Sequence, residues 1–207
     1  MKLGIFGASG HAKEILDIAL DIGYTKIVFI NTDTKEKHCM GFPVIGEDEI
    51  YLLKKDEYEF AIGVGDNHIR ENIFHRFETL NFPNIVHPAA TFGYGQSKEI
   101  RSALGNVVAA GARISCDVHI GNFGIYNHNC TIGHDCIIED FVHIAPGANV
   151  SGYVNLSAGS FIGTNASILP GSENDRIVIG KNATVGAGSV VTKSVPANAV
   201  VKGIPAK

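Results

Sequence analysis

His134 and Asp135 are neighbouring residues whose side chains could together carry out a proton transfer. An imidazole accepts protons near neutral pH, and an adjacent carboxylate orients the ring and favours its charged form. If residues 18 apart lie one above the other, as the repeat described below predicts, His134 lies between Cys116 and Gly152. Both neighbours are small and leave room for a substrate. We therefore predict that His134 is a general base; the alternative is a surface histidine without a role.

The same segment also contains the side chains of a zinc site, since imidazole and thiolate are zinc ligands. The four candidates are His128, Cys130, His134 and Cys136. The two cysteines occupy equivalent positions in successive six-residue units, which places them about 120° apart around a three-sided coil. They cannot converge on one ion, so we interpret them as small buried hydrophobic residues and expect no metal.

A glycine-rich turn near the N-terminus has the residue types that approach phosphate. Residues 7–11, Gly-Ala-Ser-Gly-His, join an apolar run to a helical pattern. Glycines let backbone N–H groups approach a ligand, and a helix N-terminus favours anions. The turn matches only part of the G-x-G-x-x-G fingerprint, because Ala12 occupies the third glycine position. By itself it is equally compatible with a tight turn that binds nothing.

Two other apolar runs end in residues that could join this turn in one site. Asn31, Thr32 and Asp33 follow the run at 27–30, and Gly65 follows the run at 60–64. Ligands of open parallel sheets bind beyond the carboxyl ends of the strands. The three strand ends therefore indicate one crevice, and they favour nucleotide binding there.

The element that must position His134 is a repeat of six residues in the second half of the chain. Ten of eleven positions at this spacing are Val, Ile or Leu. They are Val108, Ile114, Ile120, Tyr126 (the exception), Ile132, Ile138, Ile144, Val150, Leu156, Ile162 and Ile168. This period is typical of a parallel β-helix, in which each hexapeptide forms one flat face and one corner. The phase breaks after Ile168 and resumes at Ile179, so we expect a protruding loop over 169–176.

The element that must position the glycine-rich turn is an α/β domain. Short apolar runs alternate with helical patterns at 12–20 and 68–80, which predicts βαβ units and a small parallel sheet covered on both faces. Residues 82–86 could add a last strand. We place the domain boundary near residue 90, with an α/β domain at 1–90 and the β-helix at 91–207.

Composition excludes several other classes of protein. The 207 residues carry a net charge of −4, which gives no basic footprint for nucleic acid. No run of 18 apolar residues and no basic-apolar leader is present, so we expect neither a membrane span nor a signal peptide. Four cysteines are too few for a disulfide framework in a chain of this length. We expect a cytoplasmic protein.

Three stretches of the sequence resemble one known family: 131–148, the turn at 7–11 and the ending at 201–207. The chain is similar to the bacterial sugar O- and N-acetyltransferases of the sialic acid acetyltransferase type. Within that family it most resembles the UDP-4-amino-sugar N-acetyltransferases of the bacillosamine type and the GDP-perosamine N-acetyltransferases. The resemblance implies a Rossmann-like domain at 1–90 that holds the nucleotide of a sugar. It also implies a left-handed β-helix at 91–207 that forms homotrimers and binds acetyl-CoA between subunits.

The resemblance also implies roles for individual residues. His134 matches the catalytic base, Asp135 its acidic neighbour, and His143 a histidine that contacts acetyl-CoA. The positions that line the pantetheine channel are Gly152, Thr164, Gly186 and Ala187. The positions that hold the nucleotide are Ser9, Gly10, His11, Asn31, Thr32 and Gly65. Asn31 stands where bacillosamine-type enzymes have Asp, which leaves the preference for base or ribose open.

The function that follows is acetyl transfer from acetyl-CoA to the 4-amino group of a nucleotide-linked 4-amino-4,6-dideoxy sugar, for surface glycan biosynthesis. A UDP-linked sugar is favoured and a GDP-linked sugar is possible. One alternative is an O-acetyltransferase acting on sialic acid or a related sugar, which would use the same histidine. A second is a hexapeptide scaffold without catalysis, against which the His134–Asp135 pair argues. An NAD-dependent dehydrogenase is disfavoured by the incomplete fingerprint and the short α/β unit.

Overall fold

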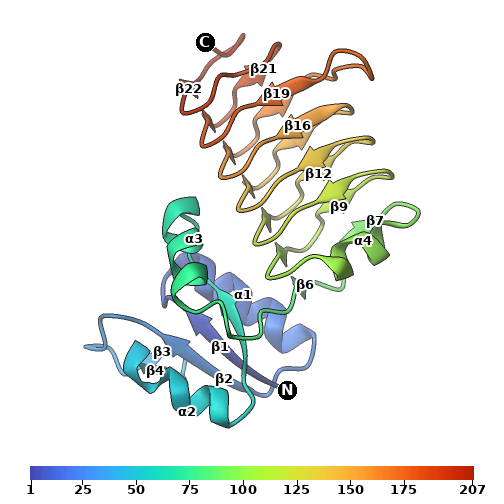
Figure 1. Ribbon diagram of the computed structural model, residues 1–207. Coiled ribbons are helices and arrows are strands. Elements are labelled where there is room, and N and C mark those ends of the chain that lie inside the picture. The colour runs from blue at the N-terminus through green and yellow to red at the C-terminus, as the bar shows by residue number, and fades with distance from the viewer.

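A computed structural model describes all residues from 1 to 207, and its N-terminal part is a five-stranded α/β sheet (Figure 1). The strands lie in the order β3-β4-β2-β1-β5, and only β3 is antiparallel to its neighbour. Their bounds are β1 (Lys2–Phe6), β2 (Lys26–Ile30), β3 (His38–Cys39), β4 (Phe42–Ile45) and β5 (Glu59–Ile62). The helices are α1 (Gly10–Asp21), a 3-10 turn (Glu47–Glu49), α2 (Ile50–Lys55) and α3 (Asn67–Arg76). The carboxyl ends of β2, β1 and β5 are therefore adjacent.

The C-terminal part is a parallel β-helix with three faces, which rises as a stack of coils in Figure 1. Face 1 contains β6 (Ile85–Val86), β8 (Val107–Val108), β11 (Ile125–Tyr126), β14 (His143–Ile144), β17 (Phe161–Ile162), β20 (Thr184–Val185) and β22 (Val200–Val201). Face 2 contains β7 (Thr91–Phe92), β9 (Arg113–Ile114), β12 (Thr131–Ile132), β15 (Asn149–Val150), β18 (Ser167–Ile168) and β21 (Val190–Val191). Face 3 contains β10 (His119–Ile120), β13 (Ile137–Ile138), β16 (Val154–Leu156) and β19 (Ile177–Ile179). Helix α4 (Gln96–Ser102) packs near β10.

The six-residue repeat fills the interior of this β-helix, as predicted. All eleven repeat positions belong to one core of 27 buried residues. Tyr126, the exception to the aliphatic rule, is only 1% exposed, and its hydroxyl has no hydrogen-bond partner. Thr131 pairs with Asn149, 18 residues later, so one coil is three hexapeptides long.

Two details of the α/β region differ from the sequence-based expectation. The last strand expected there is β6, but it pairs with β8 and so begins face 1 of the β-helix rather than extending the N-terminal sheet. The β-helix thus begins before the proposed boundary at residue 90. The third helix is also shorter than its pattern indicates, since α3 ends at Arg76. No helix of the structure is both long and apolar enough to cross a membrane.

The corners between faces 1 and 2 alternate between glycine and asparagine. Gly111, Asn129, Gly147, Asn165 and Gly188 occupy this corner in five successive coils, with φ between 56° and 73°. Glycine and asparagine tolerate this left-handed backbone best. A Cβ on Gly111 would collide with Oδ1 of Asn129, and a Cβ on Gly147 would collide with Oδ1 of Asn165. Each asparagine therefore occupies the space that the glycine of the coil before it leaves empty.

A buried arginine joins the two parts of the molecule. Arg70 of α3 is 1% exposed, and its Nε and Nη2 each donate a hydrogen bond of 2.8 Å to a corner of the β-helix, at Phe123 O and Phe141 O respectively. Its Nη1 donates to Val64 O (3.1 Å) and Gly65 O (3.2 Å) in the loop after β5. Burial lowers the pKa of the guanidinium to about 10. Arg70 thus fixes the Gly65 loop against two coils.

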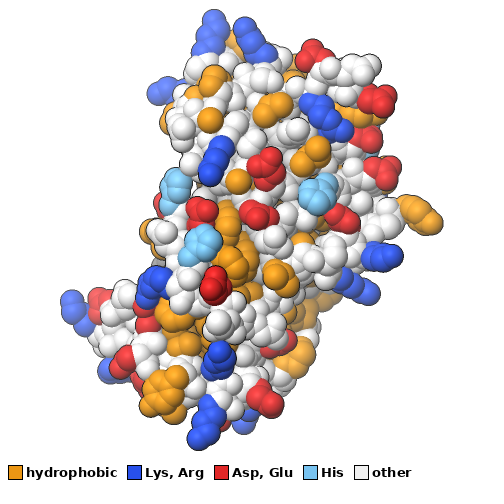
Figure 2. All heavy atoms as spheres, in the orientation of Figure 1, with side chains coloured by type: hydrophobic (Ala, Val, Ile, Leu, Met, Phe, Trp, Pro, Cys, Tyr) orange, Lys and Arg blue, Asp and Glu red, His pale blue; other side chains and the backbone are white.

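Aromatic packing and one amide complete this junction. Phe123 and Phe141 stack with ring centroids 5.3 Å apart, and Phe74 of α3 lies 4.4 Å from Phe123. Hydrophobic side chains gather where the two parts meet in Figure 2. Asn67 Nδ2 donates to Gly159 O (2.7 Å), which extends the contact to a third coil. The α/β domain is therefore held by three successive turns of the β-helix.

Candidate active site

His134 and Asp135 form a hydrogen-bonded pair at the corner between faces 2 and 3. His134 Nδ1 lies 2.6 Å from Asp135 Oδ2, and the imidazole side chain is 54% exposed. Asp135 adopts the left-handed corner conformation, with φ of 57°. When Nδ1 donates to the carboxylate, Nε2 is left without a proton and can accept one. The pair therefore has the arrangement that a general base requires.

The coil above leaves the imidazole accessible through a glycine. A Cβ at Gly152 would lie 2.7 Å from Cε1 and 2.8 Å from Nε2 of His134, so only glycine leaves this space open. The predicted stacking of His134 beneath Gly152 is thus present. Next to Gly152, the ring of Tyr153 meets His134 edge-on, with centroids 5.3 Å apart and planes at 89°. The imidazole nevertheless stays half-exposed and so accessible to a reacting group.

The cysteines near this site have the environment of core residues. All four are free thiols, and Cys130 and Cys136 are buried. Burial raises the pKa of Cys130 to about 12, which keeps the thiol protonated at neutral pH. No group of three or more His, Cys, Asp or Glu side chains is arranged to hold a metal ion.

The residues expected to bind the nucleotide lie along the adjacent carboxyl ends of β1, β2 and β5. Ser9 and Gly10 begin α1 directly after β1. His11 Nδ1 lies 2.9 Å from Glu14 Oε2, and this contact lowers the pKa of the Glu14 carboxyl. Asn31 Nδ2 donates to Asp33 O (3.0 Å) just after β2. The three strand ends that the sequence analysis grouped into one crevice are therefore neighbours in the sheet.

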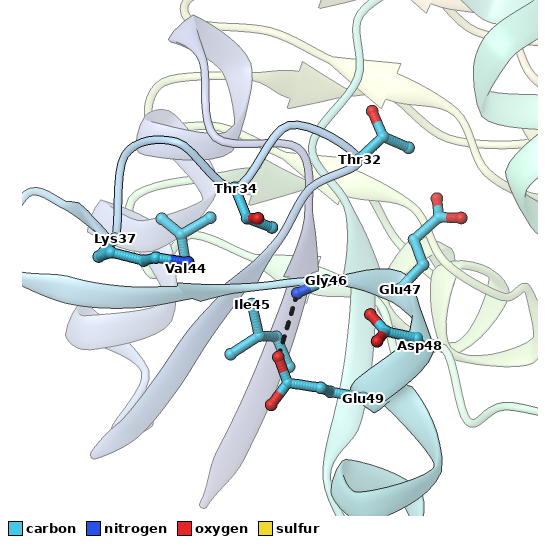
Figure 3. Close-up of a pocket in the computed structure, with 9 residues that line it drawn as sticks. All are labelled: Thr32, Thr34, Lys37, Val44, Ile45, Gly46, Glu47, Asp48 and Glu49. Carbon is cyan, nitrogen blue, oxygen red and sulfur yellow. Dashed lines mark hydrogen bonds between the residues drawn. The ribbon is translucent and has the colours of Figure 1, made fainter.

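Two pockets lie on either side of the end of β2. One of about 270 Å³ lies beside Ala8, Lys13 and Asn31. The other, of about 410 Å³, is lined by polar and charged residues that Figure 3 shows around the ends of β2 and β4. They are Thr32, Thr34, Lys37, Gly46, Glu47, Asp48 and Glu49, with Val44 and Ile45.

His143 lies beside this crevice, on face 1 of the β-helix. Its Nδ1 lies 3.0 Å from Gly65 O, and its ring centroid lies 6.3 Å from that of His11. Burial, with a smaller contribution from the Arg70 charge, lowers the pKa of His143 to about 4. The ring is therefore neutral, donates to Gly65 O through Nδ1 and presents a buried, unpartnered Nε2 as an acceptor. The structure groups His143 with His11 and Gly65 of the expected nucleotide set.

A further pocket of about 410 Å³ extends from His143 along face 1. Its lining comes from both parts of the molecule: Gly65, Asp66, Asn67, His68, His143, Gly159, Phe161, Asn182 and Thr184. The crevice of the α/β domain thus continues onto the outer surface of face 1.

The remaining expected site residues lie on other edges of the β-helix. Gly152 shares the corner between faces 2 and 3 with His134, whereas Thr164, Gly186 and Ala187 lie at the corner between faces 1 and 2. In a three-sided coil the corner between faces 2 and 3 is opposite face 1. One chain therefore does not bring His134 to its own crevice.

Two residues of this site were not predicted from the sequence. Tyr153 packs against His134, and the Nη1 of Arg176 donates to the backbone oxygen of Asp135. Tyr153 could have been found, because it lies 18 residues after Asp135 and therefore stacks on it. Arg176 could not, because the repeat is interrupted before it.

The fold and the site define the class of acyltransferases built on a hexapeptide β-helix. The family model described as the PglD N-terminal domain matches residues 2–77. The GDP-perosamine N-acetyltransferase of Escherichia coli O157:H7 is 31% identical over 218 residues, which cover 99% of this chain and 94% of that protein. The chain belongs to this family of hexapeptide sugar N-acetyltransferases. It is an acetyl-CoA-dependent sugar acetyltransferase.

Solved structures agree with this assignment over the whole chain. PerB from Caulobacter crescentus, in complex with CoA and GDP-perosamine, has a TM-score of 0.87 at 26% identity, covering 100% of this chain and 96% of that one. The acetyltransferase domain of PglB from Neisseria gonorrhoeae FA1090, in complex with acetyl coenzyme A, has a TM-score of 0.86 at 33% identity, covering 100% and 98%. The predicted fold is thereby confirmed: a Rossmann-like domain followed by a left-handed parallel β-helix.

Proposed function

We propose that this protein transfers the acetyl group of acetyl-CoA to the 4-amino group of a nucleotide-linked 4-amino-4,6-dideoxy sugar. The observation that carries the proposal is the His134–Asp135 pair, 2.6 Å apart, beneath the opening left by Gly152. The crevice at the ends of β1, β2 and β5 supports a nucleotide-linked acceptor. Relatives whose names contain GDP-perosamine support a GDP-linked sugar, whereas the sequence resemblance favours a UDP-linked one.

In the proposed reaction the base acts on the sugar amine directly. Acetyl-CoA supplies the thioester carbonyl, which the neutral amine attacks. His134 Nε2 takes the proton that the nitrogen loses, and the same proton can then reach the departing thiolate as the C–S bond breaks. Asp135 favours the charged imidazolium. A backbone N–H near Gly152 would stabilise the oxyanion.

We propose that the complete site forms between copies in a homotrimer. The crevice extends along face 1, and His134 lies on the opposite corner, so a neighbouring copy must supply the base. Gly152, Thr164, Gly186 and Ala187 would then face acetyl-CoA between subunits. His143, to which the family resemblance gives a contact with acetyl-CoA, lies near enough to the crevice to contact the acceptor as well.

Mixed oligomers test this shared site. One variant is His134→Ala; the other is Gly10→Trp, at a position where no atom lies within 4 Å of a Cβ and a large side chain would fill the crevice. Each variant alone should be inactive. Co-refolded in equal amounts, the two variants should recover about a quarter of wild-type activity. Each site needs an intact crevice from one copy and an intact His134 from its neighbour, and random assembly brings these together in about one site of four. Absence of recovery would contradict a shared site.

The activity itself is tested with an acceptor panel. UDP- and GDP-linked 4-amino-4,6-dideoxy sugars and free sialic acid are each incubated with acetyl-CoA, and release of free CoA thiol is measured. We expect turnover with one of the nucleotide-linked amines, and a kcat about 10²–10⁴-fold lower for His134→Ala. His119→Ala is the matched control, since that side chain is 67% exposed and contacts only Glu99. Activity on sialic acid alone would sink the proposal and favour the O-acetyltransferase.

A further inference from the structure

The loop that interrupts the repeat folds back onto the catalytic corner. It comprises residues 169–176, between β18 and β19. Gly171 N donates to Gly152 O (3.1 Å), and a Cβ on Gly171 would lie 2.6 Å from Tyr153 O. Ser172 and Asp175 exchange backbone hydrogen bonds of 2.9 and 3.2 Å, which close the loop into a tight turn. The loop is therefore attached to the coil directly above His134.

The last residue of this loop reaches the catalytic pair from above. Arg176 Nη1 donates to Asp135 O and to Asn155 Oδ1, the latter at 3.3 Å. Its guanidinium carbon lies 5.4 Å from the centroid of the Tyr153 ring. Tyr153 in turn packs edge-on against His134. Arg176, Asp135, His134 and Tyr153 therefore form a closed ring of contacts, in which each residue touches the next.

We propose that Arg176 is a positioning residue that holds the imidazole of His134 in the orientation needed for proton transfer. The inference rests on the proposed role of His134 as the base. Without Arg176, the half-exposed ring keeps its contacts with the Asp135 carboxylate and the Tyr153 ring, but neither of these two groups is held by the guanidinium. Arg176 restrains the Asp135 backbone directly and the other side of the imidazole through the Tyr153 ring.

The stacking on Tyr153 favours an arginine over a lysine at this position. A planar guanidinium can stack on an aromatic ring while one of its nitrogens, here Nη1, donates to Asp135 O and Asn155 Oδ1. A lysine ammonium can still donate to these oxygens but has no planar group to stack on Tyr153, so Arg176→Lys should rescue only part of the effect. Because Asp135 contributes its backbone oxygen to this contact, its carboxylate stays available to His134 Nδ1.

The test compares Arg176→Gln and Arg176→Lys with wild type in the acetyl-transfer assay, measuring kcat, both KM values and thermal melting. We expect kcat to fall about tenfold or more for Arg176→Gln, with partial rescue by Arg176→Lys and both KM values within about threefold of wild type. The matched control is Glu173→Gln in the same loop, whose side chain is exposed and whose variant should keep wild-type kcat.

A double-mutant cycle separates this role from simple loop stability. Tyr153→Leu should reduce kcat as Arg176→Gln does. The double variant should lose little more activity than either single variant, because both substitutions interrupt the same ring of contacts around His134. Fully additive losses, unchanged kcat, or a raised KM for acetyl-CoA at unchanged kcat would each overturn the inference. If His134→Ala is inactive while Arg176→Gln turns over normally, only this inference fails. If His134→Ala is fully active, the proposed function fails as well.

Discussion

Replacing Arg70 with methionine should destabilise the junction between the two parts of the protein. The arginine is 1% exposed, and no carboxylate is among its hydrogen-bond acceptors. Methionine retains most of the aliphatic volume but donates no hydrogen bond. The substitution therefore isolates the contribution of the guanidinium.

The magnitude follows from two opposing effects. Five hydrogen bonds of 2.8 to 3.2 Å are lost, and at about 1.5 kcal/mol for each bond to a charged donor they are worth about 7.5 kcal/mol. Against this, the methionine variant avoids the cost of burying a cation. The drop of the Arg70 pKa from 12.5 to about 10 puts that cost at about 3 kcal/mol. The net loss should be about 4 kcal/mol.

Thermal and urea unfolding, monitored by circular dichroism at one protein concentration, measure this loss. For a chain of this size, 4 kcal/mol corresponds to a Tm lower by about 8–16 °C. Arg76→Met is the matched control on the same helix. The Arg76 side chain is 53% exposed and pairs with Glu47, so its variant should lose less than about 1 kcal/mol. Equal losses for the two variants would refute the reasoning.

Two further predictions concern the corner that carries His134 and the crevice. Gly152→Ala should lower kcat at least about tenfold, because the added Cβ would lie 2.7 Å from the His134 ring; wild-type turnover in a folded variant would contradict this. His143 should make the folded state less stable as the pH is lowered. Its pKa is 6.5 in the unfolded chain and about 4 in the folded one, so below pH 6.5 the unfolded chain binds a proton that the folded protein does not, which favours unfolding. Wild type should lose about 2 kcal/mol more than His143→Asn between pH 8 and pH 5, measured by urea unfolding, and parallel pH curves would disprove it.

The β-helix could be predicted from the sequence in nearly full detail, because its core has a fixed period. Each coil contacts only its neighbours, so the six-residue spacing alone determines which side chains lie inside and which stack. The position of Gly152 over His134 followed from that spacing. Tyr126 was accommodated at an aliphatic position without disturbing the register.

The contacts between the two parts could not be predicted, since they depend on how α3 meets the β-helix. Nothing in the spacing of Arg70 indicates that it caps Phe123 O and Phe141 O. For the same reason His143 was assigned to acetyl-CoA without its contact to Gly65. Arg176 was missed because it follows an insertion, where the periodic argument no longer applies.

The alternation of glycine and asparagine along the corner between faces 1 and 2 has a consequence for how this sequence can vary. Gly147→Asn alone would collide with the amide of Asn165, although asparagine tolerates the left-handed backbone at that corner. If Asn165 is replaced by glycine, the side chain that Gly147→Asn would collide with is gone, and the substitution can be accommodated. The effect of a substitution at this corner therefore depends on the residue 18 positions away, and the two positions should be changed together rather than one at a time.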